Sequence, residues 1–151
     1  MKIKIYWIGR TKDAAIQALT EDYLKRIARH SPAEGISLRD EVALLEACGR
    51  GTRAKGGGSK SWLVLLDSSG KEFSSEQFAK FLGDYQDRNP LPLAFAIGGA
   101  DGFSETTKSS AQQVISLGKM TLPHELARVV LLEQLYRAFT ILKGHPYHTG
   151  H

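Results

Sequence analysis

The sequence predicts one α/β domain, residues 1–151, with a mostly parallel sheet and helices on both of its faces. Apolar, strand-like runs alternate along the whole chain with segments of helical periodicity, and that alternation is typical of βαβ units. Two of the runs, 62–66 and 93–97, are apolar at every position, as in strands covered on both faces. The length of 151 residues, 42% of them hydrophobic and 24% charged, fits a single globular domain.

The first third of the chain predicts two strands and two helices. Alternating β-branched and charged residues at 3–7 indicate the first strand. Helical spacing of apolar residues then predicts an amphipathic helix from about 13 to 30, followed by a short strand at 36–38. Asp40 is placed to cap a second helix. The side chains that this helix is expected to bury are Val42, Leu45 and Cys48.

The remaining elements follow from turn and capping signals. After the strand at 62–66, residues 67–70 form a turn rich in Asp, Ser and Gly. Ser74 and Gln77 make a capping-box pair that starts a helix, and Ser104 caps a helix of about ten residues after the strand at 93–97. A short strand at 114–117 and a long helix at 124–143 complete the pattern. That last helix is apolar around most of its girth, which indicates a subunit interface as well as a core contact.

Charge and hydropathy narrow the range of partners. The chain has 20 basic and 16 acidic side chains and a formal net charge of +4, which suits a phosphate-rich partner such as RNA. Residues 49–60, rich in glycine, serine and cations, predict a flexible basic loop. The longest apolar run is far shorter than the ~20 residues of a membrane helix, and 1–9 lacks the apolar segment of a signal peptide. We therefore expect a cytoplasmic protein that binds no membrane.

Three strand ends are the predicted ligand site, because ligands of open α/β sheets bind outside the carboxyl ends of the strands. These ends are 66–71, 97–102 and 117–122. The glycines at 98, 99 and 102 either let backbone groups approach a ligand closely or serve only as a tight connection to the next helix. Asp67 likewise has two interpretations, a contact to a ribose hydroxyl or a turn residue.

The C-terminal segment concentrates titratable and aromatic side chains. His145, Tyr147 and His148 surround a proline that breaks any helical register, and no carboxylate or thiolate lies nearby in sequence. We therefore expect no metal site there; a stacking ring beside two imidazoles instead suits contact with RNA. Arg137 either makes a bidentate contact to a phosphate or carboxylate or pairs with Glu133 one turn earlier.

Four stretches in order carry a resemblance to a known family: Ile97–Gly102, Leu117–Arg128, Glu133–Ala138 and His145–His148. With them the chain closely resembles the RlmH family, SPOUT-class methyltransferases that act on N3 of a pseudouridine in 23S ribosomal RNA. The resemblance implies a C-terminal trefoil knot, a homodimer with its site at the interface, and S-adenosylmethionine bound in the knot. The cofactor contacts that it implies are Leu66, Gly98, Gly99, Leu117, Gly118, Lys119, Met120, Thr121 and Leu122.

The implied reaction is a direct methyl transfer that needs alignment and removal of a proton from the base. The candidate catalytic residues are Arg137, His145, Tyr147 and His148, and either Tyr147 or His148 assists the proton loss or only positions the base. Cations of the 50–60 loop, with Lys25, Arg26 and Arg29, are expected to attract RNA phosphates. Thr149 stands where family members often have a basic residue.

Two other functions are compatible with the same residues. A non-catalytic RNA- or ribosome-binding module would share the fold and the salt-dependent RNA binding but would neither bind nor consume S-adenosylmethionine. A flavodoxin-like nucleotide binder is disfavoured, since only one glycine follows the first strand, where a glycine-rich phosphate loop would lie.

Overall fold

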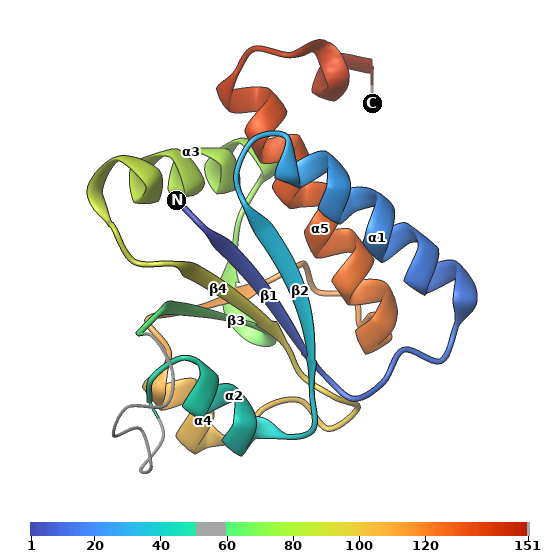
Figure 1. The fold of residues 1–151 in the computed structure, drawn as a ribbon, viewed down its shortest axis with the longest axis vertical. Helices are drawn as coiled ribbons and strands as arrows, with labels where there is room; N and C mark the ends of the chain where they lie inside the picture. The colour runs from blue at the N-terminus through green and yellow to red at the C-terminus, as the bar shows by residue number, and fades with distance from the viewer. Residues whose placement is uncertain (51–59, 151) are drawn as a thin grey trace.

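A computed structural model describes residues 1–50 and 60–150 of the chain. Its elements are β1 (Ile3–Ile8), α1 (Ala14–Ala28), β2 (Ala33–Leu38), α2 (Glu41–Ala47), β3 (Trp62–Glu72), α3 (Ser75–Arg88), β4 (Leu93–Ile97), α4 (Glu105–Ser110), β5 (Gln113–Ser116), α5 (His124–Leu142) and the 3-10 helix η1 (Pro146–Gly150). The strands form one parallel sheet in the order β2-β1-β4-β3-β5 (Figure 1). The predicted α/β class with a parallel sheet is confirmed.

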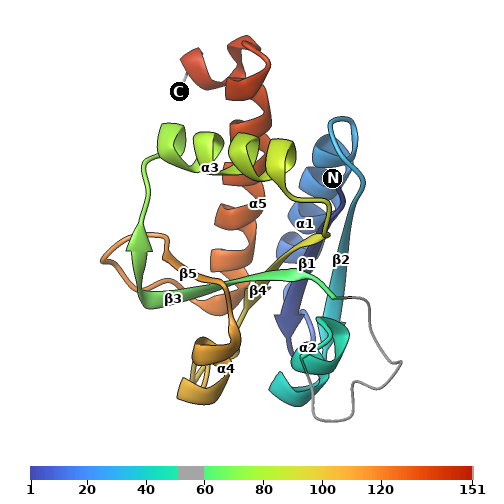
Figure 2. The ribbon, with the colours of Figure 1, turned by 90° about the vertical axis from the view of Figure 1, so that its left-hand side faces the viewer.

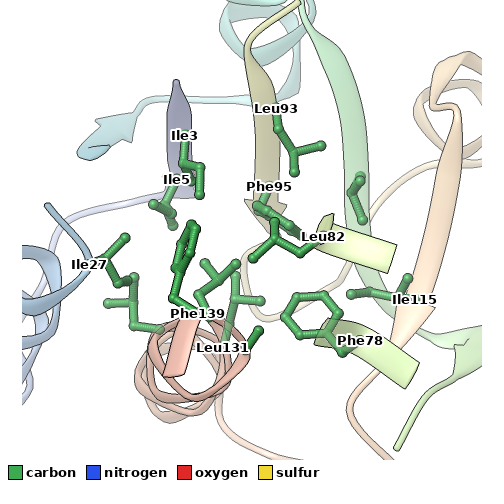
Figure 3. Close-up of a cluster of buried hydrophobic side chains, with 14 of the residues drawn as sticks. Ile3, Ile5, Ile27, Phe78, Leu82, Leu93, Phe95, Ile115, Leu131 and Phe139 are labelled. Carbon is green, nitrogen blue, oxygen red and sulfur yellow. The ribbon is translucent and has the colours of Figure 1, made fainter. Parts of the chain in front are cut away.

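Helices cover both faces of this sheet. Helices α1, α3 and α5 lie on one face, and the shorter α2 and α4 lie on the other (Figures 1 and 2). The larger core fills the space under α1, α3 and α5, where Ile5, Phe95 and Leu131 meet (Figure 3). A second, smaller core includes Leu44 of α2 and Leu65 of β3. The first half of β3, at 62–66, and strand β4 are therefore covered on both sides, which explains their continuous apolar sequences.

Side-chain caps fix the starts of several helices, and those at Asp40 and Ser74 are as the sequence predicts. Asp13 accepts a hydrogen bond from the backbone N–H of Ala15 at 2.8 Å, and Asp40 accepts one from that of Ala43 at 2.9 Å. Before α3, the Ser74 hydroxyl and the Gln77 amide each bond the other's backbone N–H. Each cap satisfies a donor that the first helical turn leaves unpaired.

Several predicted details are wrong. Of the three side chains that the second helix was expected to bury, Cys48 is buried as predicted, Leu45 is half-buried and Val42 is 64% exposed. Leu44 is buried in place of Val42, because Leu44 and Cys48 lie four residues apart on one face. Strand β2 begins at Ala33 rather than at 36. Helix α4 has six residues rather than about ten, and its cap at Ser104 is as predicted. The predicted basic loop falls mostly on 51–59, which lie outside the described residues.

The predicted turn at 67–70 is instead part of β3. The strand continues to Glu72, and its pairing with β5 shifts register between Leu66 and Lys71. A Cβ on Gly70 would lie 2.6 Å from the carbonyl carbon of Ile115, closer than two such atoms can approach, so only glycine fits at this crossing. The irregularity brings the end of β3 directly against β5, beside the predicted ligand loops.

Helix α5 is the central support of the larger core. Its buried side chains include Leu131, Leu135 and Phe139, and it packs between α1 and α3 (Figure 2). Leu126 on the same helix remains 41% exposed. None of the helices in the described ranges combines the length and apolar character that crossing a membrane requires.

Candidate active site

A cavity of about 330 Å³ opens at the carboxyl ends of β4 and β5 and beside residues 66–68 of β3. All three strand ends singled out in the sequence contribute to its wall. Eight of the nine residues expected to contact the cofactor line it: Leu66, Gly98, Gly99, Leu117, Gly118, Met120, Thr121 and Leu122. The ninth, Lys119, lies in the same loop but does not line the cavity. Further lining residues absent from that expectation include Asp67, Asp101, Ser116 and His124.

The glycine loop after β4 leaves room for a ligand at one position and none at its neighbour. A Cβ on Gly99 would meet only the Cγ2 of Ile8, at 4.0 Å. A Cβ on Gly98 would lie 3.1 Å from the carbonyl carbon of Gly102. The loop is closed by the N–H of Gly102, which donates to the carbonyl of Gly99 at 3.0 Å. The open space at Gly99 is thus a cradle that a side chain would fill.

The loop after β5 is held by its own serine. The Ser116 hydroxyl donates to the carbonyl of Gly118 at 2.9 Å and accepts from its N–H at 3.1 Å. Gly118 has φ of 140°, a conformation that glycine adopts readily. Beyond it, Met120 is 88% exposed at the rim of the cavity. The backbone of this loop is therefore fixed by local contacts while an apolar side chain stands free at its edge.

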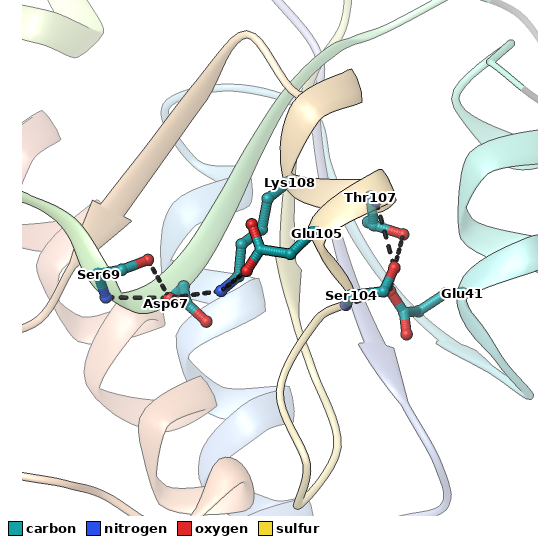
Figure 4. Close-up of polar contacts among 7 residues, drawn as sticks. All are labelled: Glu41, Asp67, Ser69, Ser104, Glu105, Thr107 and Lys108. Atoms are coloured by element: carbon teal, nitrogen blue, oxygen red, sulfur yellow. Dashed lines mark hydrogen bonds and ion pairs between the residues drawn. The ribbon is translucent and has the colours of Figure 1, made fainter.

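Asp67 is the most enclosed charged group in the cavity wall. Its Oδ2 accepts from the backbone N–H of Ser69 at 2.9 Å and from the Ser69 hydroxyl, and it lies 3.4 Å from Lys108 Nζ (Figure 4). Burial works to raise the pKa of this carboxyl, but the Ser69 hydrogen bonds and the Lys108 charge outweigh it, so the pKa lies below its ordinary value. Asp67 is ionised at neutral pH. Asp67 therefore hydrogen-bonds locally to Ser69 within β3, in place of the predicted turn.

A second carboxylate fixes the far end of the glycine loop. Glu41 of α2 accepts from the backbone N–H of Ser104 at 3.0 Å and from its hydroxyl at 3.1 Å (Figure 4). Because Ser104 is also the cap of α4, this contact ties α2 to α4 directly after the loop. The loop is thus anchored at both ends, which limits its movement around a ligand.

The C-terminal segment packs on α5 rather than on the cavity. The Tyr147 ring lies 4.7 Å from that of Tyr136 at 73°, and its hydroxyl donates to Glu133 Oε1 at 3.4 Å. Arg137 Nε donates to the same Glu133 oxygen at 2.9 Å, which confirms the predicted ion pair. His145 accepts from the N–H of Tyr147 through Nδ1, at 3.2 Å. His148 lies in η1, and its side chain is outside what the structure describes.

Tyr147 is held in its protonated form in this arrangement. Burial, a hydrogen bond with Tyr23 and the charge of Glu133 together raise the pKa of the Tyr147 hydroxyl. Here the hydroxyl is therefore a hydrogen-bond donor and not a proton acceptor.

The cavity and the C-terminal segment lie against different parts of α5. His124 and Ala127, in its first turn, line the cavity, whereas Tyr147 contacts Glu133 and Tyr136, at the middle and in the second half of the helix. Ala127 and Glu133 are separated by about 9 Å along the helix axis. Figure 1 shows the strand ends and the C-terminus at opposite ends of the molecule. Among the side chains that the structure describes, Arg137, His145 and Tyr147 do not line the cavity of their own chain.

The cations expected to attract RNA differ in whether they are exposed or already paired with other groups of the protein. Lys25 and Arg29 are exposed on α1. Arg26 pairs with Asp22 at 3.2 Å and lies over the ring of Tyr23. Arg50 is not a free surface cation, contrary to expectation: its guanidinium donates to three backbone carbonyls. These belong to Cys48, Ser61 and Ser110.

Sequence reasoning missed one buried cation near the cavity. Arg128 of α5 is 1% exposed, its guanidinium lies 4.0 Å from the ring centre of Trp7, and it donates to the Thr11 hydroxyl at 2.8 Å. It therefore fixes the segment after β1 against the start of α5. Its position among apolar residues of a helix was the only available signal. Across 1–50 and 60–150, no group of three or more His, Cys, Asp or Glu side chains is placed to hold a metal ion.

Comparison with known families assigns the class. A family model described as "Predicted SPOUT methyltransferase" matches residues 1–148. Two solved structures share the fold: a probable methylase family protein from Haemophilus influenzae (TM-score 0.57, 12% identity, 96% of this chain and 69% of that one) and a probable methyltransferase from Bordetella pertussis (TM-score 0.56, 10% identity, 91% and 94%). The class is therefore that of the SPOUT methyltransferases.

Relatives at higher identity narrow this to one family. The protein called ribosomal RNA large subunit methyltransferase H in Koribacter versatilis is 53% identical over the full length of both chains. Its namesake in Geobacter sp. is 40% identical over 98% of this chain and 99% of its own. The chain belongs to the RlmH family of SPOUT methyltransferases.

Proposed function

We propose that this protein transfers a methyl group from S-adenosylmethionine to N3 of a pseudouridine in 23S ribosomal RNA, as a single-domain enzyme of the cytoplasm. The observation that carries the proposal is the cavity, whose wall holds eight of the nine positions that the family resemblance assigns to the cofactor. The names of the full-length relatives support large-subunit ribosomal RNA as the substrate. A cytoplasmic site of action follows from that substrate.

The residues around the cavity fit the proposed cofactor. Gly99 offers open space beside exposed backbone, and the fixed loop after β5 offers further backbone groups, so both loops can hold a ligand through main-chain contacts. When bound, S-adenosylmethionine supplies an activated methyl group on a positively charged sulfur. The protein then has to hold the methyl donor in one position and align the base with its methyl group. No metal is needed for that task. The trefoil knot belongs to this proposal, since the loop after β5 would form part of it.

The C-terminal segment supplies the candidate groups for the base. We assign Arg137 to a phosphate or to an oxygen of the RNA, His145 and Tyr147 to positioning of the base, and His148 to removal of its N3 proton. The raised pKa of Tyr147 favours a donor role for its hydroxyl over that of a base. Exposed cations such as Lys25 and Arg29 would attract the RNA backbone.

A homodimer would bring the two halves of the site together. Tyr147 contacts Glu133 and Tyr136, which lie about 9 to 14 Å along α5 from the cavity residue Ala127. In the proposed dimer, the segment of one protomer reaches the cavity of its partner. An antiparallel pair related by a two-fold axis achieves this for both sites at once. Exposed Leu126 on α5 and Leu19 on α1 would contribute apolar surface to such an interface.

We expect light scattering to give a mass of about twice 16.6 kDa at micromolar concentration. The apolar surface of α5 and the divided site both require a partner of the same kind. A monomer at that concentration would contradict the shared site.

The decisive test of function uses ribosomes that lack this modification. We expect the purified protein to incorporate labelled methyl groups from S-adenosylmethionine into their 23S RNA, at N3 of one pseudouridine. A protein that binds ribosomes in a salt-dependent way without binding the cofactor would instead be the non-catalytic module.

A further inference from the structure

The cavity wall carries negative charge and no fixed positive charge. Among the described lining residues, the charged carboxylates are Asp67 and Asp101; the lining includes His124 but no lysine or arginine. Asp101 is exposed, so water and salt screen its charge. The Asp67 side chain is only 13% exposed, and its charge therefore acts over a longer range through a less polar medium.

The two oxygens of Asp67 have different surroundings. Oδ2 accepts from the backbone N–H and the hydroxyl of Ser69 and lies beside Lys108 Nζ. Oδ1 receives no hydrogen bond from the part of the chain that the structure describes. It lies 3.7 Å from the position that a Cβ on Gly102 would take, and Gly102 is itself a lining residue. The carboxylate thus keeps one unused acceptor next to the cavity, while Lys108, which does not line it, is held at the other oxygen (Figure 4).

We infer that Asp67 makes the cavity prefer the positively charged methyl donor over the neutral product of the reaction. This inference rests on the proposed function. On transfer, the methyl carbon forms a bond to the base nitrogen, that nitrogen loses its proton, and the electron pair of the carbon–sulfur bond stays on sulfur. The sulfonium thereby becomes a neutral thioether, and the rest of the molecule is unchanged. A fixed carboxylate near the cavity attracts the donor more than the product, and so it favours both donor capture and product release.

Calorimetric titration with S-adenosylmethionine and S-adenosylhomocysteine tests this inference without any turnover. In Asp67→Asn the amide oxygen can still accept from Ser69, but the charge is gone. We expect the affinity for S-adenosylmethionine to fall about tenfold and that for S-adenosylhomocysteine by less than about twofold, the difference expected for one nearby charge. Glu72→Gln is the matched control: it removes an exposed charge at the end of the same strand, outside the cavity wall, and should change both affinities by less than about twofold.

Lys108→Met should change the preference between the two ligands in the direction opposite to Asp67→Asn. It removes the cation that partly neutralises Asp67, so preference for the charged donor over the product should increase by about two- to fivefold. If the Asp67–Lys108 pair were purely structural, both Asp67→Asn and Lys108→Met would lower the affinity for both S-adenosylmethionine and S-adenosylhomocysteine. That result would overturn the inference. Equal weakening of the two ligands in Asp67→Asn would also overturn it, since Asp67 would then contact a group that both share.

The wild-type protein gives a test that does not depend on how the variants fold. Between about 50 and about 500 mM salt, the affinity for S-adenosylmethionine should fall while that for S-adenosylhomocysteine stays constant. The same salt dependence for both ligands would overturn the charge preference and leave the proposed function standing. If the wild-type chain bound neither ligand, the proposed function would fail, and the inference with it.

Discussion

Ending the chain after Gly144 should lower methyl transfer by about 100-fold or more and leave the affinity for S-adenosylmethionine within a few-fold of the full chain. The removed segment contains His145, Tyr147 and His148, which we assign to the base. It lies on the second half of α5, away from the cavity of its own chain. Methyl incorporation into ribosomes that lack the modification, measured beside calorimetric binding, separates the two effects.

A chain that ends after His148 is the matched control for this truncation. It keeps the proposed catalytic groups and loses only 149–151, so its turnover should be close to that of the full chain. Full turnover by the shorter chain would show that the segment is dispensable. Loss of cofactor binding would show that the segment closes over the cavity, and the division of roles between the cavity and the segment would be wrong.

Gly99→Val should weaken S-adenosylmethionine binding by at least about 100-fold, or about 2.7 kcal/mol, in a protein that remains folded. A Cβ at this position meets only Ile8, at 4.0 Å, and Gly99 is not among the glycines with positive φ. The fold therefore tolerates valine, whose branched side chain fills the space where a ligand would contact the backbone.

Gly98→Val is the contrasting variant for that experiment. Its Cβ would lie 3.1 Å from the backbone of Gly102, so this substitution should lower the free energy of unfolding by about 1–3 kcal/mol. Thermal unfolding and calorimetry on both variants separate loss of fold from loss of binding. A folded Gly99→Val protein with normal affinity would remove the glycine loop from the cofactor site.

The two inactive proteins also test whether the site is shared. Mixing the chain that ends after Gly144 with the Gly99→Val chain, under conditions that allow subunits to exchange, should restore about a quarter of wild-type activity. Random exchange makes half of the dimers mixed, and each mixed dimer holds one complete site of two. A site built within one chain predicts no recovery.

Most of the fold could be predicted because its elements carry strong local signals. Residues 62–66 and 93–97 are apolar at every position, and Asp40, Ser74 and Ser104 mark helix starts with side-chain caps. The errors arose where tertiary contacts decide. Residues 67–70 have the composition of a turn, but the close approach of Gly70 to β5 keeps them in the strand. Val42 is exposed because α2 directs Leu44 and Cys48 inward.

Only part of the candidate site could be predicted from the sequence. Parallel strands end at one edge, so the three cofactor loops could be placed together from their sequence order alone. The contacts of Asp67 with Lys108 and of Arg50 with the carbonyl of Ser110 join residues far apart in the chain, and no local pattern encodes them. The position of the C-terminal segment depends on how α5 packs, which also leaves no local signature.

The separation of the cavity from the C-terminal segment along α5 has a consequence for how enzyme activity responds to dilution. If each working site needs the cavity of one chain and the C-terminal segment of another, then a lone chain is inactive whatever its own integrity. Below the dimer dissociation constant, the fraction of chains in pairs falls in proportion to total concentration. Total turnover would then fall with the square of enzyme concentration, so the protein's abundance in the cell would set the rate of ribosome modification more steeply than for a monomeric enzyme.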